Sequence, residues 1–150
     1  MTATAALAAA LAPLARAGDV IALHGPLGAG KTAFARAFIA AHAAGAGLDA
    51  AAVGDVPSPT FTLVQTYDMT DPAIWHFDLY RLKEAEEAME LGIDDAFASA
   101  ISLVEWPERL GGYLPSRALH LHLAFDAAEG ARTARLMGGG DWPARLEKLA

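Results

Sequence analysis

The chain has 150 residues, which suits one domain built around a single hydrophobic core. Its 18 Asp and Glu residues outnumber 11 Lys and Arg, and the resulting net charge of −7 argues against direct binding of nucleic acid by this chain alone. The sequence contains no cysteine, which excludes disulfides and thiolate chemistry and suits a reducing, cytoplasmic location.

The N-terminal segment, residues 4–14, is predicted to form a helix. Thr4 is a suitable N-cap, the leucines that follow it are spaced to form one apolar stripe, and Pro13 is expected to shorten or bend the helix. Residues 1–15 are apolar but contain no Lys or Arg, so we interpret them as this helix rather than as an export signal. No stretch approaches the roughly 18 uninterrupted apolar residues of a membrane span.

A glycine-rich motif at residues 25–32 comes next. It reads Gly-Pro-Leu-Gly-Ala-Gly-Lys-Thr, in which two glycines are separated by four residues and followed by Lys and Thr. An apolar run at 20–23 precedes it and a strongly helix-forming segment at 32–44 follows, which is the order of strand, loop and helix that a phosphate-binding loop requires. A glycine-rich turn without a ligand would not need the Lys-Thr pair, so we predict a phosphate loop.

The predicted loop supplies the groups that bind a nucleoside triphosphate. Backbone N–H groups of the turn form a cradle for oxyanions, and the positive end of the following helix points at the same place. Lys31 is expected to neutralise the β and γ phosphates, and Thr32 to offer a hydroxyl ligand to Mg²⁺. The residues predicted to bind ATP in this loop are Gly25, Gly28, Ala29, Gly30, Lys31, Thr32 and Ala33.

A long segment rich in Ala and Gly follows this helix. Residues 43–56 have no stable period and are predicted to form a loop. The hydroxyls of Ser58, Thr60 and Thr62 come directly after it, either as a switch that reaches the γ-phosphate or as ordinary turn chemistry.

The next part of the chain is predicted to form a pair of strands. Alternating residues at 61–67 and an apolar run at 74–78 flank a turn at 68–72, as in a hairpin. The acidic segment 83–91 has helical composition and is interpreted as a solvated face, with a partner-binding edge as the alternative. A short helix through Phe97 follows, capped by Asp94 or Asp95. The remaining predicted elements are strands at 101–105, 118–125 and 132–137 and a helix at 142–149.

Two acids stand at the ends of predicted strands. Asp78 ends the strand that begins at residue 74, and Glu105 ends the strand that begins at 101. Ligands of α/β sheets lie beyond the carboxyl ends of the strands, so we expect one of these acids to hold the metal and the other to orient a water molecule. The alternative for each acid is to cap the element that follows it.

Aromatic and imidazole side chains near these positions carry weaker signals. Trp106 follows Glu105 and is expected either to stack on adenine or to pack beside the site. His76, His120 and His122 occupy strand positions without a supporting cysteine or metalloprotease-type spacing, so we interpret them as structural or surface residues rather than metal ligands.

These motifs together resemble the TsaE (YjeE/YdiB) family. The segments that carry the resemblance, which spans residues 4–137, are the phosphate loop, Ser-Pro-Thr-Phe-Thr-Leu-Val at 58–64, His-Phe-Asp-Leu-Tyr-Arg-Leu at 76–82, Leu-Gly-Ile at 91–93 and Leu-Val-Glu-Trp-Pro at 103–107. We predict one α/β domain over residues 1–150. It is expected to be a P-loop NTPase-like sandwich with a mostly parallel central sheet, an added antiparallel portion and flanking helices.

The resemblance implies a function and roles for individual residues. It implies a bacterial ATPase needed to form N6-threonylcarbamoyladenosine on tRNAs, acting with the TsaD and TsaB proteins and meeting tRNA only through that complex. Lys31 then binds the β and γ phosphates, Thr32 and Glu105 hold Mg²⁺, and Asp78 is the Walker-B-like acid. Thr60 lies, with Thr62, in the switch-like segment.

Two other readings remain open from the residues alone. A small-molecule P-loop kinase would share the loop and helix, but would need an acceptor pocket and an arginine-bearing lid, whereas the arginines here are scattered. A nucleotide-gated binding module without essential hydrolysis would use the acidic segment 83–91 as its docking face. A GTPase is disfavoured because the sequence has neither an Asn-Lys-x-Asp motif nor an Asp-x-x-Gly switch.

Overall fold

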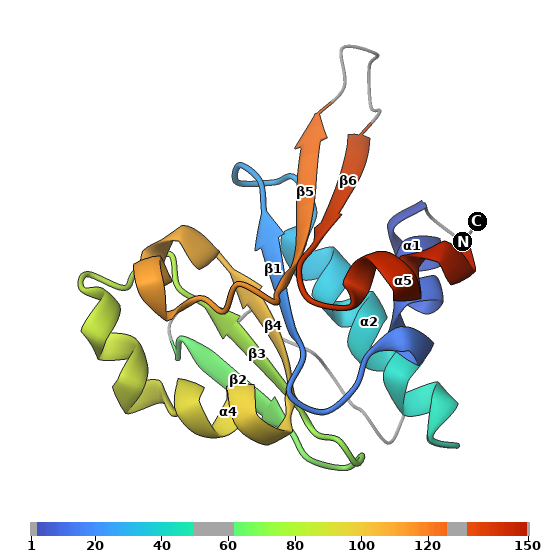
Figure 1. Ribbon diagram of the computed structural model, residues 1–150, viewed down its shortest axis with the longest axis horizontal. Helices are drawn as coiled ribbons and strands as arrows, with labels where there is room; N and C mark the ends of the chain where they lie inside the picture. Colours follow the sequence, from blue (N-terminus) through green and yellow to red (C-terminus); the bar gives the residue numbers. More distant parts are fainter. Residues whose placement is uncertain (1–2, 50–61, 126–131, 150) are drawn as a thin grey trace.

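The computed structural model describes residues 3–49, 62–125 and 132–149, which form a central sheet between two layers of helices (Figure 1). The strands are β1 Val20–His24, β2 Val64–Tyr67, β3 Ile74–Asp78, β4 Ile101–Glu105, β5 Leu119–Phe125 and β6 Arg132–Gly138. The α-helices are α1 Ala3–Leu11, α2 Lys31–Gly45, α4 Ile93–Ser99 and α5 Trp142–Leu146. The 3₁₀ helices are η1 Ala12–Leu14, η2 Ala85–Leu91, η3 Pro107–Tyr113 and η4 Glu147–Leu149.

The sheet is mixed but mostly parallel. Within the described residues it has 6 strands in the order β2-β3-β4-β1-β5-β6. β3, β4, β1 and β5 are parallel to one another, while β2 and β6 run antiparallel at the two edges. The predicted α/β fold, with its added antiparallel portion, is therefore confirmed, and β1 and β4 lie side by side at its centre.

Apolar side chains on both faces of the sheet form the two cores. Ile21 and Leu23 of β1 pack with α1 and α2 on one face, while Val20 packs with α4, η2 and η3 on the other. Successive side chains of a strand point to opposite faces, so the continuous apolar run of β1 is buried on both sides. On α2, Phe34 and Phe38 belong to the first of these cores and are fully buried.

Some local predictions were wrong in detail. The strand expected from residue 61 begins at Val64, because Leu63 has a left-handed φ of 68° and its carbonyl accepts the Asp78 N–H at 3.0 Å. The acidic segment 83–91 is helical over Ala85–Leu91, as a 3₁₀ helix, with Glu86 and Glu90 exposed. The N-cap of α4 is Gly92, with φ 87°, rather than either aspartate.

The predicted loop at 43–56 is partly replaced by helix. α2 continues to Gly45 before the chain turns, and residues 50–56 of that segment lie outside the described residues. The predicted hairpin is confirmed, since β2 and β3 pair in antiparallel register.

A buried ion pair fixes the start of β1. Asp19, which precedes the strand, accepts two hydrogen bonds from the Arg145 guanidinium, at 2.5 and 3.1 Å. Arg145 also donates to the Leu14 carbonyl and to Asp141. Because this bidentate contact joins α5 to the segment before β1, it fixes the end of the strand opposite to the glycine-rich residues 25–32.

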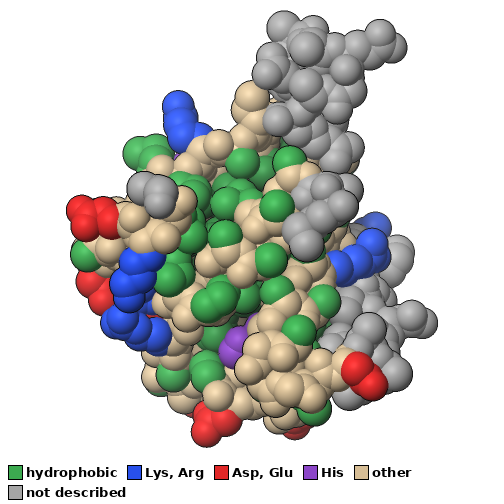
Figure 2. Space-filling view, turned by 90° about the vertical axis from the view of Figure 1, so that its right-hand side faces the viewer, with side chains coloured by type: hydrophobic (Ala, Val, Ile, Leu, Met, Phe, Trp, Pro, Cys, Tyr) green, Lys and Arg blue, Asp and Glu red, His purple; other side chains and the backbone are tan. Residues whose placement is uncertain are grey.

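The surface over α1, α2 and α5 has apolar side chains across its middle and charged ones toward its margins (Figure 2). Lys and Arg on that face stand apart and do not merge into one basic patch. Among the described residues, helices fall short of the length and apolarity needed to traverse a membrane.

We predict that Arg145→Met lowers the free energy of unfolding by about 3–5 kcal/mol, because it leaves the buried Asp19 carboxylate without its charged partner and with the Arg16 backbone N–H as a donor. Urea unfolding followed by circular dichroism measures this. Arg16→Met is the matched control: its pair with Asp141 at 3.3 Å is exposed, so the loss should stay below about 1 kcal/mol. Equal losses in the two variants would contradict the role given to Arg145.

Candidate functional site

The glycine-rich loop joins the end of β1 to the start of α2. Gly25 lies so close to β5 that a Cβ atom there would stand 2.5 Å from the Leu123 carbonyl oxygen. Gly30 caps α2 with φ 106°, a conformation that L side chains rarely adopt. The backbone conformation therefore requires glycine at both positions, and the sequence motif identified both.

The rest of the loop forms a tight turn at the N-terminus of α2. Ala29 donates its N–H to the Pro26 carbonyl at 3.1 Å and is buried, while Leu27 at the tip is 68% exposed. Lys31 and Thr32 occupy the first turn of this 15-residue helix, and Ala33 follows on its exposed side. The N-terminal N–H groups and the positive end of the helix dipole therefore face the space beside the loop.

The predicted metal-binding pair lies in direct contact. The Thr32 hydroxyl stands 3.0 Å from each carboxylate oxygen of Glu105. The contact exists because β4 pairs directly with β1, so the end of β4 lies beside the loop. Glu105 is only 2% exposed, so its carboxylate has lost its contact with water, and the hydrogen bonding from Thr32 compensates part of that loss.

His76 is a second partner of Glu105 that sequence reasoning missed. Its Nε2 lies 2.7 Å from Glu105 Oε2, and the imidazole is completely buried. Because an ionised carboxylate only accepts, His76 donates through Nε2, and its Nδ1 has no hydrogen-bond partner within the described part of the chain. Its position two residues before the strand-end Asp78, on the same face of β3, was the available signal.

Asp78 lies beside Glu105, because these two residues are opposite each other in the parallel register of β3 and β4. It is buried, and its Oδ1 accepts the Tyr80 N–H at 3.1 Å, which orients the carboxylate at the turn after the strand. The two strand-end acids of the sequence prediction are thus neighbours on the loop side of the sheet.

Lys31 is held by the loop and by an aromatic ring. Its Nζ donates to the Gly25 carbonyl at 2.5 Å and stands 3.3 Å from the centre of the Trp106 ring. Burial lowers the pKa of Lys31, while the charges of Glu105, Glu108 and Asp78 act in the opposite direction. Trp106 therefore contacts the lysine of the glycine-rich loop through a cation–π interaction.

An apolar cavity of about 210 Å³ opens on another side of the first turn of α2. Its lining residues come from α1, α2, β5 and β6: Ala3, Thr4, Leu7, Phe34, Leu123, Thr133 and Ala134. Trp106 is not one of them.

Two residues of the predicted switch segment, Ser58 and Thr60, lie outside the described residues. Thr62 is described and is exposed in the turn before β2.

A family model described as "Threonylcarbamoyl adenosine biosynthesis protein TsaE" matches residues 1–134. The chain belongs to the TsaE family.

Individual TsaE relatives agree with this assignment. The chain is 43% identical over 102 residues to the tRNA threonylcarbamoyladenosine biosynthesis protein TsaE of Rickettsia felis, a match that covers 68% of this chain and 56% of the relative. It is 39% identical to the Haemophilus influenzae TsaE, over 79% of this chain and 69% of the relative. The matches to the Rickettsia felis and Rickettsia conorii proteins span just over half of their lengths, 56% and 54%.

A solved structure shares the fold. The crystal structure of Bacillus subtilis YdiB superposes with a TM-score of 0.75 at 29% identity, over 97% of this chain and 86% of YdiB. The likeness therefore extends through the sheet and both layers of this TsaE family member.

The contact between Lys31 and Trp106 predicts an optical signal. A phosphate group that draws the Lys31 ammonium away from the ring should change the fluorescence of Trp106 when Mg²⁺-ATP is added. We expect the change to disappear in Trp106→Phe and to persist in Trp75→Phe, whose ring stacks near Phe77 with centroids 6.0 Å apart. A signal that survives in Trp106→Phe would show that nucleotide does not act on this pair.

Proposed function

We propose that this chain binds ATP with Mg²⁺ at the phosphate loop and hydrolyses it in support of N6-threonylcarbamoyladenosine formation on tRNA. The observation that carries the proposal is the contact of the Thr32 hydroxyl with both carboxylate oxygens of Glu105, at the first turn of the loop helix. Membership of the TsaE family supports the pathway.

The donors at this position fit Mg²⁺. Magnesium prefers oxygen ligands and uses one or two carboxylates together with phosphates and water. Thr32 and Glu105 offer a hydroxyl and a carboxylate 3.0 Å apart, and Asp78 adds a second carboxylate on the neighbouring strand. When bound, Mg²⁺ would neutralise charge on the β and γ phosphates.

Side chains of this protein are proposed to bind the phosphates and to orient the water. Lys31 donates a hydrogen bond to the neutral Gly25 carbonyl, and we expect its flexible side chain to turn to a phosphate oxygen, which is a stronger acceptor. Asp78, fixed by the Tyr80 N–H, is proposed to orient the attacking water. His76 is proposed to act as a positioning residue, because its hydrogen bond holds Glu105 in one orientation.

The apolar cavity beside α2 is proposed to receive the adenine base. It lies next to Phe34, on the first turn of the helix that begins at Lys31, and it combines apolar walls with the hydroxyls of Thr4 and Thr133. Trp106 is then proposed to serve as the partner of Lys31 rather than as a platform for the base.

We propose that hydrolysis is slow in the isolated chain and is completed by TsaD and TsaB. A cation placed in trans is worth about 10³–10⁵ in rate in other phosphate-loop enzymes. Two arginines of this chain, Arg117 and Arg145, are engaged near Gly18 and Asp19, at the opposite end of β1 from the loop. The net charge of −7 likewise favours contact with tRNA through these partners rather than directly.

Point variants should affect ATP binding and ATP hydrolysis separately. We predict that Lys31→Ala weakens ATP binding by more than about 10-fold, since it removes a charge that meets the phosphates. Asp78→Ala and Glu105→Ala should retain much of the affinity yet lose about 10²-fold or more in hydrolysis, because they remove positioned groups. Calorimetry and phosphate release measure the two effects, with exposed Lys83→Ala as the control. Unchanged turnover by the Asp78 and Glu105 variants in the assembled complex would refute the assignment.

Reconstitution of tRNA modification tests the function directly. Repeated turnover by TsaD and TsaB in vitro is expected to require this chain and ATP. The Glu105→Ala variant, added in place of the wild-type chain, should not support this turnover. Full activity without the chain would overturn the proposal. Full activity with a non-hydrolysable ATP analogue would favour nucleotide gating instead of hydrolysis.

A further inference from the structure

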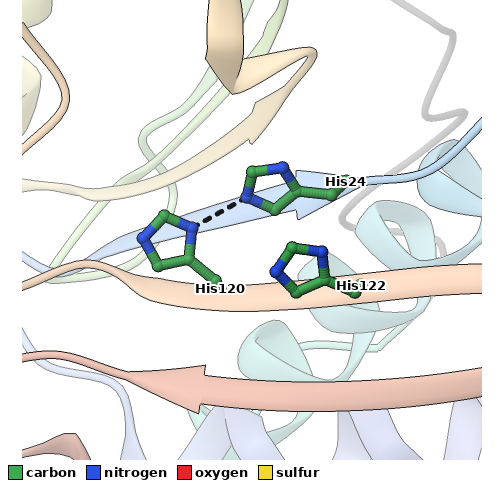
Figure 3. A group of neighbouring side chains, drawn as sticks. All are labelled: His24, His120 and His122. Atoms are coloured by element: carbon green, nitrogen blue, oxygen red, sulfur yellow. Dashed lines mark hydrogen bonds between the residues drawn. The ribbon is translucent and has the colours of Figure 1, made fainter. Parts of the chain in front are cut away.

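Three histidines gather on the face of the sheet opposite to α2. His24 is the last residue of β1, and it pairs in parallel register with His122 of β5. His120 lies two residues before His122, so its side chain points to the same face. Figure 3 shows the three imidazole rings turned toward one another above the two neighbouring strands.

The rings are close enough to share one ligand. His24 Nε2 and His120 Nδ1 lie 2.7 Å apart, and the rings of His24 and His122 stack with centroids at 4.3 Å. One nitrogen from each of the three residues lies within 4.8 Å of the others, and all three side chains are half-buried. His120 and His122, which were predicted to be structural or surface residues, therefore converge with His24, which the sequence analysis did not consider.

The geometry matches the requirements of a transition-metal ion. Nitrogens bound to one tetrahedral Zn²⁺ at about 2.0–2.1 Å lie roughly 3.3 Å from each other. The closest nitrogens, at 2.7 Å, would move slightly apart around one ion, and the others, within 4.8 Å, would move closer. Imidazole suits Zn²⁺, Cu²⁺ and Ni²⁺, whereas Mg²⁺ prefers oxygen ligands.

The surroundings of His24 and His120 favour the neutral imidazole, which is the form that binds metals. Burial lowers the pKa of His24 to about 4, helped by the charges of His122 and His120. Glu108 of η3 acts in the opposite direction on His24, and Lys31 acts in the same direction as the histidines. Burial also lowers the pKa of His120.

We propose that His24, His120 and His122 form a binding site for one divalent transition-metal ion, with Zn²⁺ as the reference ligand. Three protein nitrogens leave the fourth position of a tetrahedron to water or to an external ligand. The site does not depend on the proposed ATPase function, because none of its ligands belongs to the Thr32, Asp78 and Glu105 group.

The test is a titration of Zn²⁺ into metal-stripped protein without an affinity tag, in the absence of nucleotide. Wild-type protein is expected to bind one Zn²⁺ per chain, and an excess of Mg²⁺ should leave this binding unchanged. His122→Ala should weaken binding by at least about 100-fold, since losing even an outer partner of a metal ligand costs about 10–100-fold. Absence of the one-to-one site in the wild type would overturn the proposal.

His42→Ala is the matched control, since it removes a half-buried histidine of α2 that forms a hydrogen bond with the Pro72 carbonyl and that, among the described residues, is not part of a cluster of potential metal ligands. It should bind Zn²⁺ as the wild type does. If His122→Ala does not fold, as judged by circular dichroism, His122→Gln takes its place in the test. The Co²⁺ form of the wild type should show the visible absorption of tetrahedral coordination. Equal affinity in the His122 variants and the wild type would also overturn the proposal.

Discussion

The contact between Thr32 and Glu105 is the interaction on which the candidate site depends. A carboxylate that is 2% exposed costs several kcal/mol to bury unless hydrogen bonds compensate the lost water. Here the donors come from the first turn of α2 and from His76 in β3, so Glu105 of β4 is held from two sides. The buried charge therefore ties three elements together at the end of the sheet where the phosphate loop lies.

Both ends of β1 are secured by charged groups, but in different ways. At its start, Asp19 is fully matched by the Arg145 guanidinium, an arrangement suited to stability. At its end, Lys31 rests on a neutral carbonyl and on the Trp106 ring, contacts that are weaker than a direct ion pair. The strand is thus rigidly anchored at one end, while the lysine at the other keeps charge available for an anionic ligand.

Local features of this fold could be predicted from the sequence because local chemistry determines them. The glycine-rich loop needs glycine where a Cβ atom would clash with the Leu123 carbonyl and where φ is positive. The buried strands can be found because they are short, continuous runs of apolar residues. The same logic placed Asp78 and Glu105 at strand ends. Their adjacency follows from the parallel pairing of β3 with β4, which a single sequence does not encode in any short motif.

What the sequence left open or misplaced has the same physical origin. His76 looks like an ordinary strand residue until the register brings it to Glu105, and the sequence alone does not choose between adenine stacking and packing beside the site for Trp106, whose ring lies under Lys31. The expected strand begins late, at Val64, because the backbone of Leu63 has a left-handed φ of 68° while its carbonyl accepts the Asp78 N–H. In each case a tertiary contact outweighed the local preference.

The alternation of side chains along neighbouring strands separates two kinds of ligand group within a few residues. On the α2 face, β4 ends in a carboxylate beside a hydroxyl, an all-oxygen set suited to a hard cation. On the opposite face, β1 and β5 end in imidazoles, which suit softer transition metals. Because the donor types differ and a sheet lies between them, two cations of different character need not compete. His24 precedes Gly25 directly, so a metal held by the histidines would also restrain the backbone from which the phosphate loop begins.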